Sequence, residues 1–253
     1  MWTVRFLLAV MLTFSITGFA LPGAEKKDVL TVSVIRGNII SAIFYAILEE
    51  VCRDAGIGLE RVSYPQERSL LHTKAGMLDG DGPRNPAVEK KYPELIRVPE
   101  NFFDVEFVGF GSQEFVRQHR PVLNKWQDLK PWNVSWTRGW KIFDQNVIAA
   151  SATKLKSPGL LVPFLRAGRT DIILVTRLVG LESIAKNNAR DRIVRIPGVL
   201  ARKPQYLYLS PARRDLAPKL AAALARLKQS GRVRDIRRQH VAALDLVRPA
   251  GVH

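Results

Sequence analysis

The polar side chains best suited to bind a charged ligand follow short segments that are typical of strands. Arg84 is the first of them, because a planar guanidinium grips a carboxylate through two parallel hydrogen bonds. A Gly82-Pro83 turn would hold it in place, and the alternative is an exposed loop arginine. Asp81 would receive a ligand ammonium group or orient Arg84, with turn capping as its alternative. This segment therefore predicts contacts with a small charged ligand.

A second group of candidate residues lies at the end of another predicted strand and at the start of the helix that follows it. Arg68 follows Tyr64-Pro65 at the start of that helix, where it would reach a ligand or form a surface salt bridge. Tyr64 would stack on an apolar or cationic part of the ligand, as would Trp136 and Trp140. For all three aromatic residues the alternative is a place in the core.

Three further candidates come from other strand ends. Arg138-Gly139 follows a strand of the second half, where glycine lets the backbone approach a ligand and the next helix offers N–H groups to an anion. Thr176 ends a later apolar segment, and Arg36 ends the first. Parallel sheets bind ligands at the carboxyl ends of their strands, so all these residues are candidate ligand contacts.

The elements that must position these residues alternate between strand and helix, which predicts parallel sheets. Strands are expected at Val29–Ile35, Gly58–Tyr64, Met77–Asp79, Leu95–Pro99, Asn133–Trp136, Val147–Ser151, Asp171–Val175 and Arg192–Ile196. Helices are expected at Ile39–Ala55, Gln66–Ala75, Pro158–Ala167, Arg177–Asn187, Leu216–Gln229 and Val233–Leu244. A loop is expected from Asp81 to Pro86.

Two short segments far apart in the chain are nearly alike. Both Ala75–Gly80 and Ala167–Ile172 end a helical run with glycine and then present an aspartate before the next segment. Glycine accepts the left-handed conformation that ends a helix, so each segment predicts a helix-to-strand connection. Their recurrence indicates two similar α/β lobes. Val105–Gly111 and Gln205–Leu209 are extended and are expected to cross between the lobes.

The N-terminal residues have the layout of a signal peptide: one basic residue, an apolar run and then small residues. Residues 1–24 are therefore expected to be removed, by cleavage after Ala20 or Ala24, which predicts an exported, periplasmic protein. The formal net charge of +16 is densest between Arg202 and Arg238, with no nucleic-acid-binding motif. A solvated basic surface is the simpler interpretation, and attraction of anionic ligands or membrane surfaces is the alternative.

Cysteine and histidine usage excludes several kinds of site. Cys52 is the only cysteine, which rules out disulfides and multi-cysteine zinc sites, and its apolar helical surroundings predict an inert buried thiol. The four histidines lack ligand spacing. We expect no metal and no cofactor.

The order of elements resembles the type II periplasmic solute-binding proteins of ABC transporters, in their amino-acid-type branch (family 3). The resemblance extends over the whole mature chain, from Val29–Gly56 through the two glycine–aspartate segments and Leu129–Gly139. Its most specific part is the ending, Tyr206–Ser210 followed by Leu216–Gly231 and Asp235–His240.

This resemblance implies a two-lobed α/β fold, each lobe a mainly parallel sheet flanked by helices, joined by two crossover strands. Lobe 1 would comprise residues 25–108 and 206–253, and lobe 2 residues 109–205. It also implies a monomer that traps a small solute by hinge closure, for an ABC permease or a membrane sensor.

The sequence departs from the amino-acid binders at two places. Arg84 follows Asp79 by only a few residues, without the family's Ser-x-Thr-x-x-Arg stretch, and Thr176 stands where the family has the aspartate that holds the ammonium group. The fold inference is unaffected, but the amino-acid specificity does not carry over.

Binding of a small polar, anionic or amino-acid-like solute is the expected function. One alternative is a periplasmic enzyme similar to cyclohexadienyl dehydratases, with Glu67 or Asp81 near Arg84 as the acid–base pair. The other is an interaction protein that has lost its solute and meets an anionic partner through its basic face.

Overall fold

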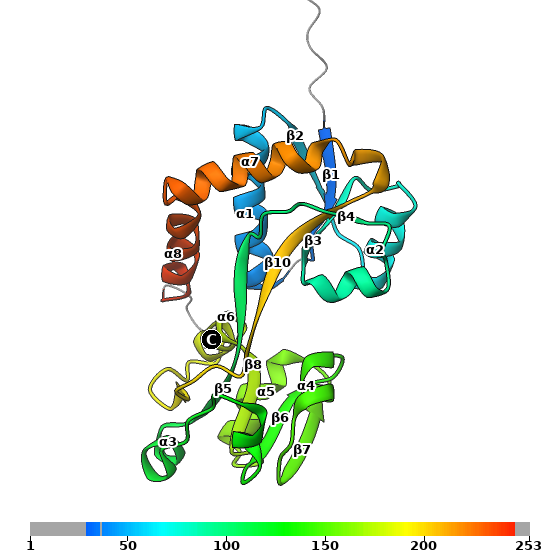
Figure 1. Ribbon diagram of the computed structural model, residues 1–253. Helices are drawn as coiled ribbons and strands as arrows, with labels where there is room; N and C mark the ends of the chain where they lie inside the picture. The colour runs from blue at the N-terminus through cyan, green and yellow to red at the C-terminus, as the bar shows by residue number, and fades with distance from the viewer. Residues whose placement is uncertain (1–28, 36, 246–253) are drawn as a thin grey trace, which may run out of the picture.

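The computed structural model describes residues 29–35 and 37–245, and it has two lobes joined by two long strands (Figure 1). The predicted signal peptide lies outside the described residues. Lobe 1 contains the following elements: β1 (Val29–Ser33), α1 (Ile39–Asp54), β2 (Gly58–Val62), α2 (Gln66–Lys74), β3 (Gly80–Arg84), η1 (Pro86–Lys90), β4 (Ile96–Arg97), η4 (Pro211–Arg213), α7 (Leu216–Gln229) and α8 (Arg232–Asp245).

Lobe 2 lies between the two crossover strands, β5 (Phe103–Ser112) and β10 (Ala201–Leu209). Its elements are α3 (Gln113–His119), η2 (Trp126–Leu129), β6 (Asn133–Thr137), α4 (Lys141–Asn146), β7 (Ser151–Leu155), η3 (Pro158–Leu160), α5 (Leu161–Arg166), β8 (Ile172–Thr176), α6 (Arg177–Lys186) and β9 (Ile193–Arg195).

The two lobes share one strand arrangement. The order along the sheet is β2-β1-β3-β10-β5-β8-β6-β7, with β4 paired to β10 and β9 to β5. β1 pairs in parallel with β2 and β3, as β6 does with β7 and β8. In each lobe a crossover strand adds antiparallel to this set, β10 on β3 and β5 on β8. The predicted fold class is confirmed.

The two similar sequence segments form equivalent helix-to-strand connections in the two lobes. Gly76 and Gly168 have φ values of +74° and +67°, the left-handed conformation that ends a helix. Asp79 then accepts a hydrogen bond from the backbone N–H of Thr31 in β1 at 2.8 Å, and its own N–H donates to the Thr31 carbonyl. Asp171 makes the same pair of bonds with Asn133 at the start of β6. Each aspartate therefore joins its helix-to-strand connection to the first strand of its lobe.

The loop predicted from Asp81 to Pro86 is wrong, as is the strand predicted at Met77–Asp79, because β3 occupies Gly80–Arg84. Glycine and proline led to the loop prediction, yet a glycine is required here by packing. A Cβ atom on Gly82 would lie 2.3 Å from Cζ of Phe44, since α1 rests directly on β3. The close approach of the helix, which the sequence pattern does not reveal, explains the composition of this strand.

Other boundaries move by a few residues. β7 begins at Ser151, where the predicted strand at Val147–Ser151 ends, and α4 precedes it. Both crossover strands are longer than predicted. The division at residues 108 and 206 stays a prediction. Within the described residues, no helix combines the length and apolar character that a membrane crossing requires.

Candidate functional site

The carboxyl ends of the parallel strands of both lobes point toward one another. β5 runs from lobe 1 to lobe 2 and pairs antiparallel with β8, so β8 and its parallel neighbour β6 run toward lobe 1. β10 returns to lobe 1 and pairs antiparallel with β3, so β3 and β1 run toward lobe 2 (Figure 1). The lobes also touch, since the backbone N–H of Ile39 donates to Glu182 Oε2 at 3.3 Å. The loops at these strand ends are therefore the facing edges of the two lobes.

Arg84 and Asp81 lie inside lobe 1 rather than on an open loop. Arg84 Nε donates to Asp81 Oδ2 at 2.7 Å, and their side chains are 4% and 2% exposed. Ser69 Oγ, from α2, donates to the other carboxylate oxygen at 2.7 Å. Both oxygens of Asp81 thus accept hydrogen bonds from buried donors. The structure supports the predicted orientation of Arg84 by Asp81, while contact of either residue with a ligand stays a prediction.

The first turn of α2 carries charges that face lobe 2. Arg68 is exposed, and Tyr64 just before the helix is half-buried with its ring 4.8 Å from that of His72. Glu67 accepts a hydrogen bond from Lys91 Nζ at 2.6 Å and one from Tyr92. The Lys91 bond is the main reason that the pKa of Glu67 is lowered, and the charge of Lys141 on α4 acts in the same direction. Charged groups of the two lobes therefore act on each other across this edge.

On lobe 2, the predicted loop after β6 is open. Arg138 is exposed, and Gly139 has a φ of +86° with enough open space that an added Cβ atom would meet nothing within 4 Å. Trp140 is half-buried, stacked on Phe143 with ring centroids 5.8 Å apart. Trp136 is a core residue whose indole N–H donates to Asp144 at 3.2 Å. The edge of lobe 2 thus offers a guanidinium, accessible backbone and one partly exposed aromatic ring.

Arg36 and Thr176 are the two remaining residues that the sequence predicts as ligand contacts. Arg36 lies outside the described residues. Thr176, at the carboxyl end of β8, is 1% exposed, and its Oγ1 has no hydrogen-bond partner among the described residues. Thr176 lines a pocket at the hinge, and this pocket was not predicted from the sequence.

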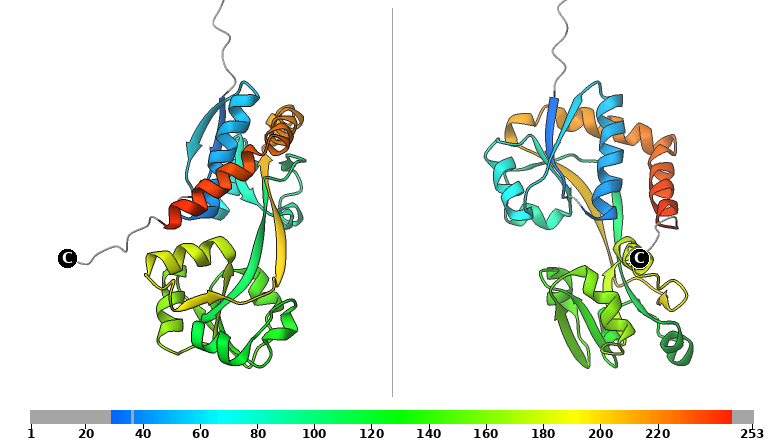
Figure 2. Two further views of the ribbon diagram at one scale, coloured as in Figure 1. Left: turned by 90° about the vertical axis from the view of Figure 1, so that its left-hand side faces the viewer. Right: turned by 180° about the vertical axis from the view of Figure 1, so that it is seen from behind.

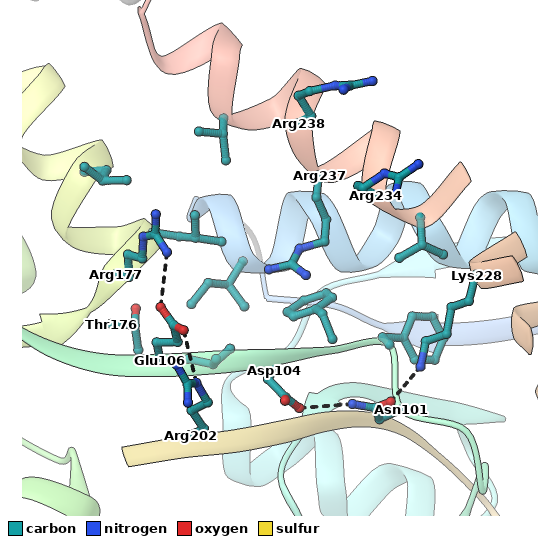
Figure 3. Close-up of a pocket in the computed structure, with 18 of the residues that line it drawn as sticks. Asn101, Asp104, Glu106, Thr176, Arg177, Arg202, Lys228, Arg234, Arg237 and Arg238 are labelled. Atoms are coloured by element: carbon teal, nitrogen blue, oxygen red, sulfur yellow. Dashed lines mark hydrogen bonds and ion pairs between the residues drawn. The ribbon is translucent and has the colours of Figure 1, made fainter. Parts of the chain in front are cut away.

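This hinge pocket has a volume of about 820 Å³ and lies between α8, α1, α6 and the crossover strands (Figure 3). Its polar lining is formed by Asn101, Asp104, Glu106, Thr176, Arg177, Arg202, Lys228, Arg234, Arg237 and Arg238. Five of its six cations fall within the dense basic run between Arg202 and Arg238, although that run alone does not indicate a pocket. No group of three His, Cys, Asp or Glu residues within the described ranges is arranged to hold a metal ion.

Comparison with known proteins gives a clear result only at the level of structure. No protein-family model matches the sequence, and no curated protein matches it. An amino-acid ABC transporter substrate-binding protein from Streptococcus pneumoniae, bound to L-arginine, is 13% identical with a TM-score of 0.61, over 85% of this chain and 95% of its own.

Two further domains are equally similar. A histidine kinase sensor domain with similarity to periplasmic binding proteins is 15% identical with a TM-score of 0.60, over 85% of this chain and 95% of its own. The VFT2 domain of Bordetella pertussis BvgS is 14% identical with a TM-score of 0.62, over 83% and 92%. The chain therefore has the two-lobed fold of the periplasmic binding proteins, which serves in both transporter components and sensors.

Proposed function

We propose that this protein is a periplasmic solute-binding protein, which holds a small polar ligand between its lobes and releases it unchanged. The observation that carries this proposal is that the strand ends of both lobes face each other and that two crossover strands join the lobes. Ligands of such sheets bind at the carboxyl ends of strands, and a two-strand hinge permits closure around them.

The facing edges favour an anionic or amino-acid-like ligand. Lobe 1 contributes the exposed guanidinium of Arg68 beside Tyr64, and lobe 2 contributes Arg138 with the accessible backbone of Gly139. Two guanidinium groups on opposite edges suit one carboxylate, because each forms charge-assisted hydrogen bonds. An ammonium group of the same ligand would compete with Lys91 for Glu67, and Trp140 would contact the apolar part of the ligand. The remaining predicted contacts, which stay part of the proposal, are Arg36, Asp81, Arg84 and Thr176.

The structural neighbours include a transporter's substrate-binding protein and a histidine kinase sensor domain. We accordingly propose that the protein, as a monomer, presents its ligand either to an ABC permease or to a membrane sensor. No nucleic acid takes part.

The test is a thermal-shift screen of the chain from residue 25 against amino acids, dicarboxylates, polyamines and aromatic acids, followed by calorimetric titration of each hit. A ligand at a hundred times its Kd stabilises the folded state by about 2.7 kcal/mol, which raises Tm by several degrees. Arg68→Ala and Arg138→Ala are each expected to weaken binding about tenfold or more, through the loss of charged hydrogen bonds.

Arg166→Ala is the matched control, because Arg166 is an exposed arginine on α5, away from the facing edges. It should bind as the unchanged protein does. A hit that is equally tight in the Arg68 and Arg138 variants would refute the proposed site. A hit that is recovered chemically altered would refute binding without turnover.

A further inference from the structure

The hinge pocket adjoins the facing edges of the lobes at Thr176, the carboxyl end of β8, but most of its lining comes from the hinge and from α8. Its floor is formed by the crossover strands and its walls by α1 and α8 on one side and α6 on the other, so both lobes contribute to it. Figure 2 shows α8 descending beside the hinge toward α6. Neither Arg68 nor Arg138 lines this pocket. A ligand bound here would therefore pair with other charged groups than those proposed for the solute.

Positive charge dominates the lining. Six arginine or lysine side chains face only two carboxylates, Asp104 and Glu106. Glu106 is shared, since Arg202 Nε and Arg177 Nη1 donate to it at 3.1 and 3.3 Å. Asp104 accepts a hydrogen bond from Asn101. Lys228 pairs with Glu100 and Arg238 with Asp235, both outside the lining, so Arg234 and Arg237 are the lining cations without an ion pair among the described residues.

Arg237 is the cation best placed to meet a ligand. Its side chain extends from α8 toward the crossover strands, whereas Arg238 extends away from them (Figure 3). Arg238 pairs with Asp235, but Arg237 has no ion pair or hydrogen bond among the described residues. Its guanidinium carbon lies 5.6 Å from the ring centroid of Phe103. Arg234 stands three residues before Arg237 and four before Arg238, spacings at which like charges repel on a helix, and an anion would relieve this repulsion.

The rest of the lining is apolar. Phe103 and Val105 from β5 are buried, and Ile40, Leu178 and Val241 add aliphatic surface from α1, α6 and α8. An inorganic anion would leave this surface unused. Pockets that combine such a surface with a few charged groups hold organic ligands, and about 820 Å³ is in their usual range.

We propose that the hinge pocket binds a small organic acid. Its carboxylate pairs with Arg237 and Arg177, and its apolar part, an aromatic ring or short alkyl chain, packs against Phe103 and the aliphatic residues beside it. Arg202 keeps Glu106 neutralised when Arg177 turns to the ligand.

The experiment is a calorimetric titration of the chain from residue 25 with 4-phenylbutyrate, with its neutral amide and with inorganic phosphate. We expect saturable binding of the acid only. Arg237→Gln should weaken it at least tenfold, because one charged hydrogen bond is lost. Arg169→Gln is the matched control, since Arg169 lies over Phe164 at 6.0 Å on lobe 2, as Arg237 lies over Phe103. It should not change the affinity.

The double variant Arg68→Ala, Arg138→Ala separates this site from the facing edges, and it should bind 4-phenylbutyrate as the unchanged protein does. Loss of binding in that variant would place the acid between the lobes and overturn the proposal. Equal binding of the amide or of phosphate would overturn it as well, as would unchanged affinity in Arg237→Gln. No binding of the acid at all would also refute it, while the solute screen would be unaffected.

Discussion

Replacing Asp81 with asparagine tests whether the buried pair in lobe 1 is a structural element. Asp81 Oδ1 accepts from Ser69 and Oδ2 accepts from Arg84, so both oxygens are in use. Asparagine has nearly the same shape but only one acceptor oxygen, and its amide nitrogen would face one of the two donors. The change therefore removes a charge and one hydrogen bond without opening a cavity.

The magnitude follows from burial. The two side chains of the pair are 2% and 4% exposed, and removal of one partner of a buried ion pair costs about 3–5 kcal/mol. Because asparagine keeps one acceptor, we expect the low end, about 3 kcal/mol in the free energy of unfolding. For a chain of this size that corresponds to a decrease in Tm of roughly 6–12 °C.

The control is Asp235→Asn, because Asp235 also pairs with an arginine three residues later, Arg238, but with exposed fractions of 38% and 72%. Exposed pairs contribute about 1 kcal/mol or less. Guanidinium denaturation followed by circular dichroism measures both variants. If Asp81→Asn were no more destabilising than Asp235→Asn, the buried pair would contribute little to folding, and the argument that Arg84 is held as part of the core would fail.

Two further predictions concern single titratable groups. Burial raises the pKa of the Cys52 thiol to about 12, so the folded protein should not react with a thiol reagent such as dithiobis(nitrobenzoate) at pH 8, whereas the unfolded protein should react fully; reaction in the folded state would contradict the assigned burial. Burial alone would raise the pKa of Glu106, but hydrogen bonds from Arg202 and Arg177 outweigh it and lower the pKa below 4.5. The stabilisation is therefore present above pH 4.5 and lost as the pH falls through the folded-state pKa. Glu106→Gln should reduce the free energy of unfolding at pH 7, measured by urea titration, and should make that free energy fall less steeply between pH 5 and 3. If the fall were as steep as in the unchanged protein, the lowered pKa of Glu106 would be refuted.

The fold was largely predictable because its signals are local. The β-branched run at β1, the apolar face of α1 and the glycines that follow α1, α2, α5 and α7 are all set by neighbours in the sequence. β3 was missed because its cause is tertiary. Gly82 is required by the ring of Phe44, which lies almost forty positions earlier, and no pattern within the strand reveals that contact.

The candidate site residues also differ in whether local sequence or tertiary structure determines their position. Arg68 and Arg138 were predicted because both follow strands, and both are exposed, Arg68 in the first turn of α2 and Arg138 in the loop after β6. Arg84 was expected in a loop as well, yet the strand that carries it draws its guanidinium into lobe 1. The hinge pocket could not be foreseen, since its basic residues come from α6, β10, α7 and α8 and meet only when the chain has crossed between the lobes twice. The sequence shows that basic residues are dense in this region, but it does not show that their side chains meet in one pocket.

The two proposed sites share the hinge, and this has a thermodynamic consequence. α8 of lobe 1 and α6 of lobe 2 contact each other beside the crossover strands, and both line the hinge pocket. Any rotation of the lobes that closes the facing edges must therefore change the separation of Arg237 from Arg177. A ligand that prefers one lobe arrangement shifts the population toward it, and the effect on the second ligand's affinity is reciprocal. Binding of an organic acid at the hinge would thus change the affinity of the solute site by the same factor as the solute changes that of the hinge, without any contact between them.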